Sequence, residues 1–137
     1  MHTMATYRIS GAAPGLTADR VTDTLGLTAS KSWEHGDRPS PRAPISPQSR
    51  WSLSSSAEPE PDVELSTQFE RVLASLTPHR EELWRLVEEG YSMDWLCYVG
   101  SHAAEHAVEM PRRLLEQLLV VPGDFLLDIY DEEPDEV

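Results

Sequence analysis

Two histidines four residues apart are the nearest approach to a metal-binding motif in this sequence. His102 and His106 stand beside Glu105 and Glu109. In a helix the two imidazoles would lie on the same side, as metal ligands must. The segment has no clear helix cap, however, and it lacks the glutamate placement of a zincin motif. Two interpretations stay open: a weak metal site at His102 and His106, or a solvated loop that holds neither metal nor cofactor.

The sequence offers few candidate nucleophiles. Its single cysteine, Cys97, lies within the apolar stretch 91–100. A reactive cysteine needs an electropositive and partly exposed site, whereas a lone cysteine among large apolar residues is more often a small buried hydrophobe. Ser54 and Ser55 lack the glycines of a nucleophile elbow. The sequence therefore predicts no catalytic residue.

Aromatic residues make up the main candidate binding site. Tryptophan and tyrosine combine a large apolar area with a hydrogen-bonding group, so they serve both cores and recognition surfaces. One interpretation is ordinary packing in the core or on a sheet. The other is a groove beside a proline-rich loop that binds a peptide, a protein or a small molecule. The candidate residues are Trp33, Asp37, Trp51, Tyr98 and Tyr130.

The net charge of −13 is unevenly distributed along the chain. Residues 1–56 hold six Lys/Arg against four Asp/Glu, while residues 57–137 hold five Arg against twenty Asp/Glu. Such a C-terminal half repels nucleic acid and anionic lipid and attracts cationic partners. The charge serves either solubility alone or docking of a cationic protein.

The chain of 137 residues has the length of one domain, which we place at residues 1–130. No apolar run is long enough for a transmembrane helix, and the first residues show no signal-peptide pattern. One cysteine excludes an internal disulfide framework. We therefore expect a cytoplasmic protein without membrane contact; formation of a homo-oligomer stays open.

Residues 91–100 are predicted to form the central strand. One face of this strand would carry Met93, Trp95, Cys97 and Val99, and the other would carry Leu96 and Tyr98. Because both faces carry large apolar groups, we expect the strand to be covered on each side. A similar stretch at residues 125–130 is also predicted to be a strand.

The remaining elements follow from periodicity and capping signals. Alternation predicts strands near residues 5–11, 30–36 and 50–55, with a weak one at 107–108. A short helix follows Thr17 and ends at Gly26. Leucine spacing predicts a helix from 65 to 76, which Asp62 can cap, and a second one from Pro78 to Gly90; the two form either a kinked hairpin or one bent helix. A last helix follows Pro111, with Leu114, Leu115 and Leu118 buried.

This order of elements predicts a single α+β domain. We expect a mixed, mostly antiparallel sheet with the helices packed largely on one face. A strand, a short helix and another strand occur near each end, which suggests a βαβ-like pseudo-repeat. Residues 38–49 should be an exposed proline-rich loop, residues 57–62 an acidic linker, and residues 131–137 an acidic disordered tail.

The order of these motifs resembles the DUF4279 family of bacterial proteins over roughly residues 4–130. That family has no assigned function, so the resemblance implies the fold and no particular chemistry. The residues that carry it are Gly11, Leu16-Thr17, Val21-Thr22, Leu25-Gly26-Leu27, Ser30, Trp33, Gly36-Asp37, Trp51-Ser-Leu-Ser-Ser55, Cys97-Tyr98 and Leu127-Asp-Ile-Tyr130.

Two classes of function are compatible with the sequence. The first is a non-catalytic binding or adaptor protein, of the inhibitor or immunity type, for a cationic protein partner. The second is an enzyme of unknown reaction whose acids and histidines are brought together by the fold. The sequence favours the first, because its acidity is marked while its nucleophile and metal motifs are weak.

Overall fold

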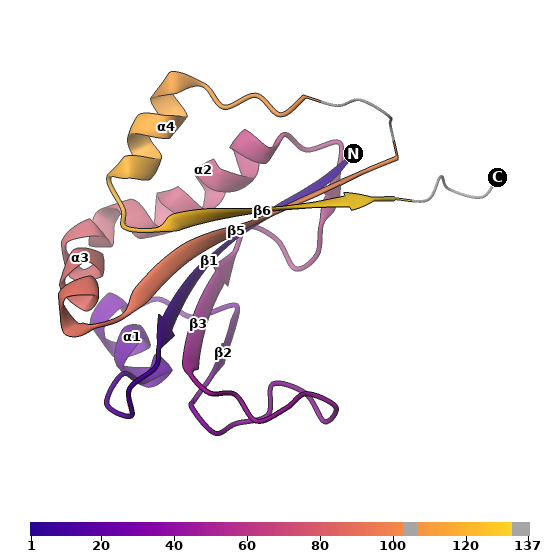
Figure 1. Cartoon of the computed structure of the whole chain (residues 1–137). Coiled ribbons are helices and arrows are strands. Elements are labelled where there is room, and N and C mark those ends of the chain that lie inside the picture. Colours follow the sequence, from indigo (N-terminus) through magenta and orange to yellow (C-terminus); the bar gives the residue numbers. More distant parts are fainter. Residues whose placement is uncertain (103–106, 133–137) are drawn as a thin grey trace.

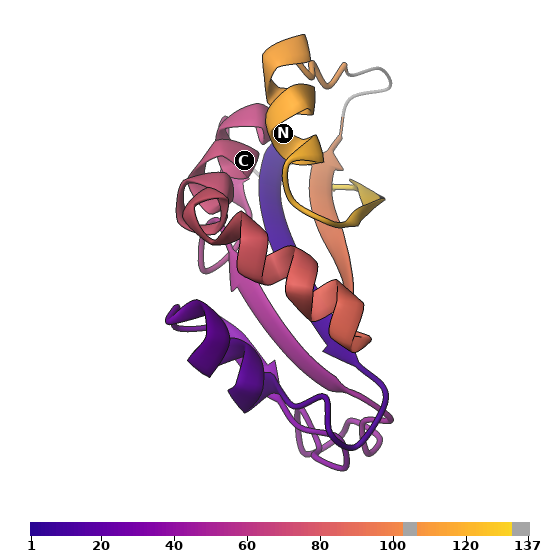
Figure 2. The same cartoon turned by 90° about the vertical axis from the view of Figure 1, so that its left-hand side faces the viewer.

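The computed structural model of this chain contains a six-stranded sheet, and every helix of the described residues packs against the same face of it (Figures 1 and 2). The structure describes residues 1–102 and 107–132. The elements are β1 (His2–Gly11), α1 (Ala18–Leu25), β2 (Lys31–Trp33), β3 (Ser49–Ser54), β4 (Glu60–Pro61), α2 (Leu65–Leu76), the 3₁₀ turn η1 (Thr77–His79), α3 (Arg80–Glu89), β5 (Ser92–Ser101), α4 (Arg112–Leu119) and β6 (Asp124–Asp131).

The order of the main strands is β2-β3-β1-β5-β6. β1 pairs antiparallel with β3 and β5, β2 pairs antiparallel with β3, and β6 pairs parallel with β5. The short β4 pairs with the N-terminal end of β1. The prediction of a single α+β domain with a mixed, mostly antiparallel sheet and helices on one face is confirmed. The pseudo-repeat stays a prediction.

Alternation along β1 and β5 places the core on the helix side of the sheet. Tyr7, Ile9, Trp95 and Val99 are all buried there, together with Phe69 from α2. The Trp95 ring meets Tyr7 and Phe69 edge to face, each at 5.0 Å between ring centroids. Such pairs contribute about 0.5–1.5 kcal/mol beyond area burial. This aromatic cluster joins the two central strands to α2.

The predicted ends of α1, with Thr17 before the helix and Gly26 after it, are confirmed. The Thr17 hydroxyl accepts a hydrogen bond from the Arg20 amide at 3.1 Å, and Gly26 takes a left-handed conformation at φ 66°. The predicted cap of α2 was wrong, because Glu64 is the N-cap residue and Asp62 itself has φ 56°. Short aspartate side chains tolerate this region better than most residues, so Asp62 belongs to the preceding turn.

Residues 65–89 form one bent helical segment, which decides between the two alternatives left open by the sequence. Pro78 lies in the 3₁₀ turn between α2 and α3. Proline cannot donate the i to i−4 hydrogen bond of a continuous helix, so the segment bends there. Gly90 then ends α3 in a left-handed conformation with φ 116°, as predicted.

Two expectations about coverage and one about a strand were wrong. Leu96 and Tyr98 of β5 are only half-buried, because no helix of the described residues covers their face of the sheet. Leu115 of α4 is exposed, since α4 presents only Leu114 and Leu118 to the core. The weak strand expected at residues 107–108 is absent from the described residues.

Residues 38–49 contain no regular secondary structure apart from Ser49, the first residue of β3. The predicted exposure holds for most of this loop but not for Ser49, which is 3% exposed, or for Ser46, which is 8% exposed. Its amide donates to the Asp37 carbonyl at 2.8 Å, and its hydroxyl accepts from the Trp33 indole at 2.9 Å. Hydrogen bonds of Ser46 therefore hold this loop against the end of β2 and the turn that follows it.

The acidic segments contribute more to the sheet than expected. Glu60, within the predicted linker 57–62, lies in β4 and hydrogen-bonds to Gln68 and Arg71. Asp131 belongs to β6, and the Glu132 amide donates to the Ser101 carbonyl at 3.0 Å. The predicted tail at residues 131–137 thus begins two residues too early; residues 133–137 lie outside the described part of the chain.

Replacing Trp95 by alanine should lower the free energy of unfolding by about 3–5 kcal/mol, as for other large buried aromatics. Trp95 is fully buried in the aromatic cluster. The matched control is Trp33→Ala, at a half-buried position, which should cost no more than about 2 kcal/mol. Urea unfolding followed by circular dichroism measures both. Equal and small losses would contradict this placement of the core.

Truncating the chain after Glu132 and after Tyr130 should give different results. Loss of residues 133–137 should leave the free energy of unfolding within about 0.5 kcal/mol of the full chain, as for surface changes. Loss of Asp131 and Glu132 as well should cost about 1 kcal/mol or more. It removes the backbone bond to Ser101 and the 2.9 Å contact between Glu132 and His2. Indistinguishable melting curves would contradict the assignment.

Candidate functional site

No helix of the described residues lies against one face of the sheet, and Figure 1 shows this face turned toward the loop at residues 34–48. Register determines which side chains occupy this open face, because paired residues on neighbouring strands point to the same side. Its charged and large members are His2, Met4 and Arg8 on β1, Lys31 and Trp33 on β2, Arg50 on β3, Asp94, Leu96 and Tyr98 on β5, and Asp124, Leu126, Asp128 and Tyr130 on β6.

Charge on the open face is divided between its two ends. The basic side chains lie on β1, β2 and β3, and the acidic ones on β5 and β6. Arg8 and Asp94 meet at the boundary, with Nε–Oδ1 and Nη2–Oδ2 distances of 2.8 and 2.5 Å. This bidentate pairing raises the pKa of the Arg8 guanidinium. The Asp94 carboxylate is thus already engaged by a structural ion pair.

Trp33 lies between two cations at the basic end. The Lys31 ammonium is 5.5 Å and the Arg50 guanidinium 5.7 Å from its ring centroid, within the range of a cation–π contact. Because its indole N–H also donates to Ser46, Trp33 connects the sheet to the base of the loop. Because Lys31 and Arg50 are both positive, the surroundings of Trp33 suit an anionic or aromatic ligand better than a cationic one.

A small polar pocket lies beside Arg50. Its volume is about 190 Å³, and its lining includes Ser10, Arg50, Asp94 and Asp124. Burial lowers the pKa of Arg50, and repulsion from Arg8 adds to that effect. Arg50 has no carboxylate within ion-pair distance in the part of the chain that the structure describes. Two aspartates in the same lining disfavour a simple anion here.

Tyr98 and Tyr130 stack at the acidic end, with ring centroids 4.8 Å apart. The Tyr130 hydroxyl donates to Asp128 at 2.7 Å, and that bond raises the pKa of Tyr130. Burial, followed by the charge of Glu132, raises the pKa of Tyr98. Both phenols are therefore protonated at neutral pH and act as hydrogen-bond donors.

The aromatic residues proposed from the sequence do not form one cluster. Trp33, Tyr98 and Tyr130 share the open face, but β3 and β1 separate the tryptophan from the tyrosines. Trp51 lies on the opposite face, fully buried, and its indole donates to the Thr22 hydroxyl at 3.1 Å. The Asp37 carboxylate accepts from the Glu34 amide in the turn after β2, so it supports local structure.

The strand at residues 125–130 was predicted, but its position at the edge of the sheet, as β6, was not. Phe125, Leu127 and Ile129 are 52%, 51% and 55% exposed although they lie on the helix side of the sheet. On the open face Leu126 and Tyr130 are 50% and 46% exposed. Apolar groups on both faces do not distinguish an edge strand from a central one. The aspartates at 124, 128 and 131 were the available signal, since charges are common on sheet edges.

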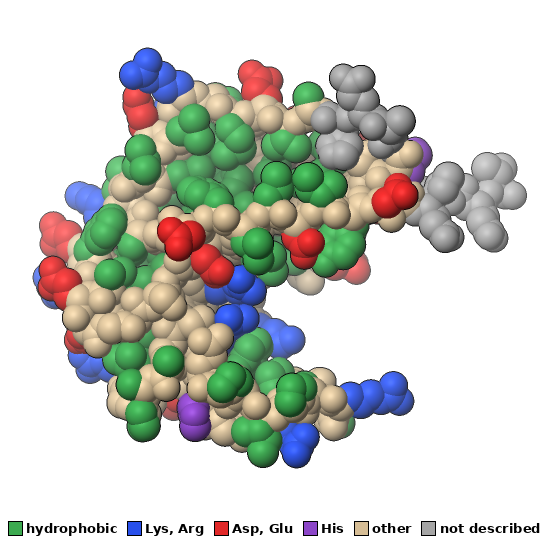
Figure 3. Space-filling model, in the orientation of Figure 1, with side chains coloured by type: hydrophobic (Ala, Val, Ile, Leu, Met, Phe, Trp, Pro, Cys, Tyr) green, Lys and Arg blue, Asp and Glu red, His purple; other side chains and the backbone are tan. Residues whose placement is uncertain are grey.

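The two edges of the sheet differ in how they are protected. The edge strand β2 has three residues, and its first is a lysine, which discourages pairing with another strand. β6 has eight residues and is mostly apolar. A long apolar edge strand is either a docking site or an aggregation hazard. Figure 3 shows hydrophobic side chains gathered between α4 and β6, with acidic ones along the strand.

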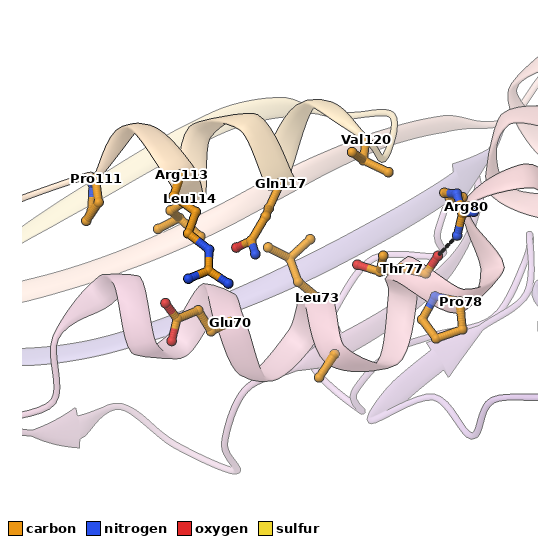
Figure 4. A pocket seen from close by; sticks show the side chains of 11 residues that line it. Glu70, Leu73, Thr77, Pro78, Arg80, Pro111, Arg113, Leu114, Gln117 and Val120 are labelled. Carbon is orange, nitrogen blue, oxygen red and sulfur yellow. Dashed lines mark hydrogen bonds between the residues drawn. The ribbon is translucent and has the colours of Figure 1, made fainter.

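A second hollow lies between α2 and α4 (Figure 4). It has a volume of about 730 Å³ and is mostly apolar, with Leu73, Leu114 and Val120 in its lining. Glu70 and Arg113 extend from opposite walls. The described residues that line it include no histidine or cysteine. Its composition fits contact with an apolar group.

Comparison with known proteins places this domain in a family. The sequence model of the family described as "Domain of unknown function (DUF4279)" matches residues 1–132. The chain belongs to the DUF4279 family. No match was found among curated proteins or among solved structures. The resemblance inferred from the motifs is therefore confirmed, and the match spans all of the described elements of this DUF4279 domain.

The metal motif receives no support from the described part of the DUF4279 domain. His102 is exposed just after β5, while His106 lies outside the described residues. Among the residues that the structure describes, no group of three or more His, Cys, Asp or Glu side chains is arranged to hold a metal ion. The site at His102 and His106 stays a prediction. In the same residues, no helix is both long enough and apolar enough to cross a membrane.

The Cys97 thiol of this DUF4279 domain should react slowly while the protein is folded. Cys97 is buried in β5, and burial, aided by the charge of Asp94, raises its pKa to about 12. At pH 8 almost none of it is the reactive thiolate. Alkylation by iodoacetamide at pH 8 should run at least about 100-fold slower than in urea. A native rate near the unfolded rate would contradict this burial.

Proposed function

We propose that this protein is a non-catalytic binding protein that captures a cationic protein partner, as an adaptor or an inhibitor does. One observation carries the proposal. β6 is an edge strand whose apolar side chains are half exposed and whose only charged residues are Asp124, Asp128 and Asp131. Exposed apolar area supplies binding free energy, and neighbouring charge of one sign selects the partner.

The distribution of charge over the whole chain supports the same partner. Residues 57–137 hold twenty acidic residues against five arginines. Several of the arginines are already paired, as Arg71 is with Glu60 and Arg112 with Glu116. An excess of negative charge around an apolar strand accelerates encounter with a positive protein at low salt. It also disfavours nucleic acid as the ligand.

The side chains that could act in catalysis are held in ion pairs, in hydrogen bonds or in the core. Asp94 pairs with Arg8, and the Cys97 thiol is protonated and buried. The tyrosines on the open face donate hydrogen bonds to neighbouring carboxylates. These arrangements favour binding over catalysis. We further propose the cytoplasm as the compartment, because the single cysteine is a free thiol and free thiols are usual in reducing compartments.

The binding function predicts one stoichiometric cationic partner. The tagged protein is incubated with lysate of its native source at 50 mM and 150 mM salt, beside an unrelated protein of equal net charge. Association should be faster at the lower salt, because exposed charges are screened over about 8 Å at 150 mM. The partner should nevertheless remain at 150 mM, since apolar contact is not screened.

Two results of that experiment would contradict the binding function. In one, the captured proteins are the same mixture of basic proteins that the unrelated acidic control retains. In the other, everything captured is lost at the first increase in salt. Either result would leave the negative charge as an aid to solubility alone.

A further inference from the structure

We propose that β6 takes up an extended segment of the cationic partner as an additional strand of the sheet. The segment would alternate apolar side chains on the helix side with lysine or arginine on the open face. This inference rests on the proposed function and adds to it the mode of docking and the sequence pattern that is recognised. Strand addition at a free sheet edge is a common way for domains to bind extended peptides.

The backbone of β6 forms hydrogen bonds to a neighbouring strand on one side only, in the described part of the chain. Its inner edge pairs with β5 along its whole length, from Asp94 opposite Asp124 to Ser101 opposite Asp131. No strand of residues 1–102 or 107–132 pairs with its outer edge. Alternate N–H and C=O groups of an eight-residue strand therefore face outward. They form a template for main-chain hydrogen bonds with a segment of similar length.

The helix side of β6 offers the apolar half of the recognition surface. Phe125 stacks on Trp95 at an interplanar angle of 5° and meets Phe69 edge to face, yet half of its area remains exposed. Leu127 and Ile129 follow at intervals of two residues with similar exposure. A strand added about 4.8 Å away would place its own side chains against these three. Apolar residues are required there.

The open face of β6 offers the charged half. Asp124 and Asp128 are the ionic side chains on this face of the strand, and Tyr130 donates to only one oxygen of Asp128. The nearest cations on the sheet, Arg8 and Arg50, belong to β1 and β3. Arg50 shares a small pocket with Asp124, but among the described residues no ion pair joins the two. Opposite charges on adjacent strands stabilise pairing. Basic residues of the partner fit this face.

A second copy of the chain fits the same edge less well. It would bring a second set of three aspartates against the first, and like charges on adjacent strands are destabilising. Each copy also has a net charge of −13. Charge thus opposes self-pairing through β6 and favours a basic strand, while the apolar side chains alone would allow either.

Synthetic eight-residue peptides test the inference on the full-length protein. The first alternates valine with lysine and threonine, and the second has glutamate in place of lysine. Fluorescence anisotropy at 150 mM salt should show at least tenfold tighter binding of the basic peptide. Two further versions of the basic peptide carry backbone N-methyl groups on alternate residues, along one edge or the other. Only the version that blocks the edge facing β6 should lose binding.

Charge-reversal variants locate the site on the protein. Asp124→Lys with Asp128→Lys should reverse the preference in favour of the acidic peptide. The matched control, Glu58→Lys with Glu88→Lys, makes the same change of net charge at exposed positions outside β6 and should keep the original preference. Circular dichroism spectra and melting temperatures of both variants establish that they are folded.

Three results would overturn the proposal of strand addition. The basic peptide fails to bind, or the two N-methylation patterns have equal effects, or sedimentation shows a dimer from which the peptide is excluded. The last result would identify a second copy as the occupant. If a cationic partner from the lysate still bound stoichiometrically, the proposed function would stand and only the docking mode would be rejected.

Discussion

The structure depends on one packing arrangement: a single layer of helices covers a single face of the sheet. Residues that alternate along β1 and β5 meet α2 on that side, and Trp95 lies among Tyr7, Phe69 and Phe125 at the centre of the contact. Because the core is complete on one side, the other side of the sheet is left to solvent. This arrangement places the polar and aromatic side chains of β2, β3, β5 and β6 where a ligand can reach them.

The same arrangement explains why β6 is unusual. It is the last strand of the sheet, and α4 buries Leu114 and Leu118 while Leu115 and Leu119 stay exposed. The strand therefore keeps its pairing with β5, but each of its large apolar side chains is about half exposed. Aspartates at both ends and in the middle keep such an edge soluble and discourage identical strands from pairing. The acidity of the chain and the exposure of β6 are the two features on which the proposed binding surface rests.

Local signals in the sequence were sufficient for most elements, and tertiary relations were not. Thr17, Gly26 and Gly90 mark helix ends through their own conformations, and the leucine spacing of residues 65–76 defines a helix face. By contrast, Trp51 and Trp33 are two of the same residue type near the same loop, yet one is in the core and the other on the open face. The apolar alternation of residues 125–130 resembles that of a central strand, because periodicity does not reveal how many neighbours a strand has.

Amide hydrogen exchange along β6, measured by NMR on the dilute protein, tests the central claim most directly. If the outer edge is free, exchange should alternate along the strand: amides bonded to β5 are protected, and the intervening amides exchange at nearly unprotected rates. β5, which has a neighbour on each side, should show protection without this alternation. Continuous protection along β6 would contradict the account, because it would mean that another strand already occupies the edge.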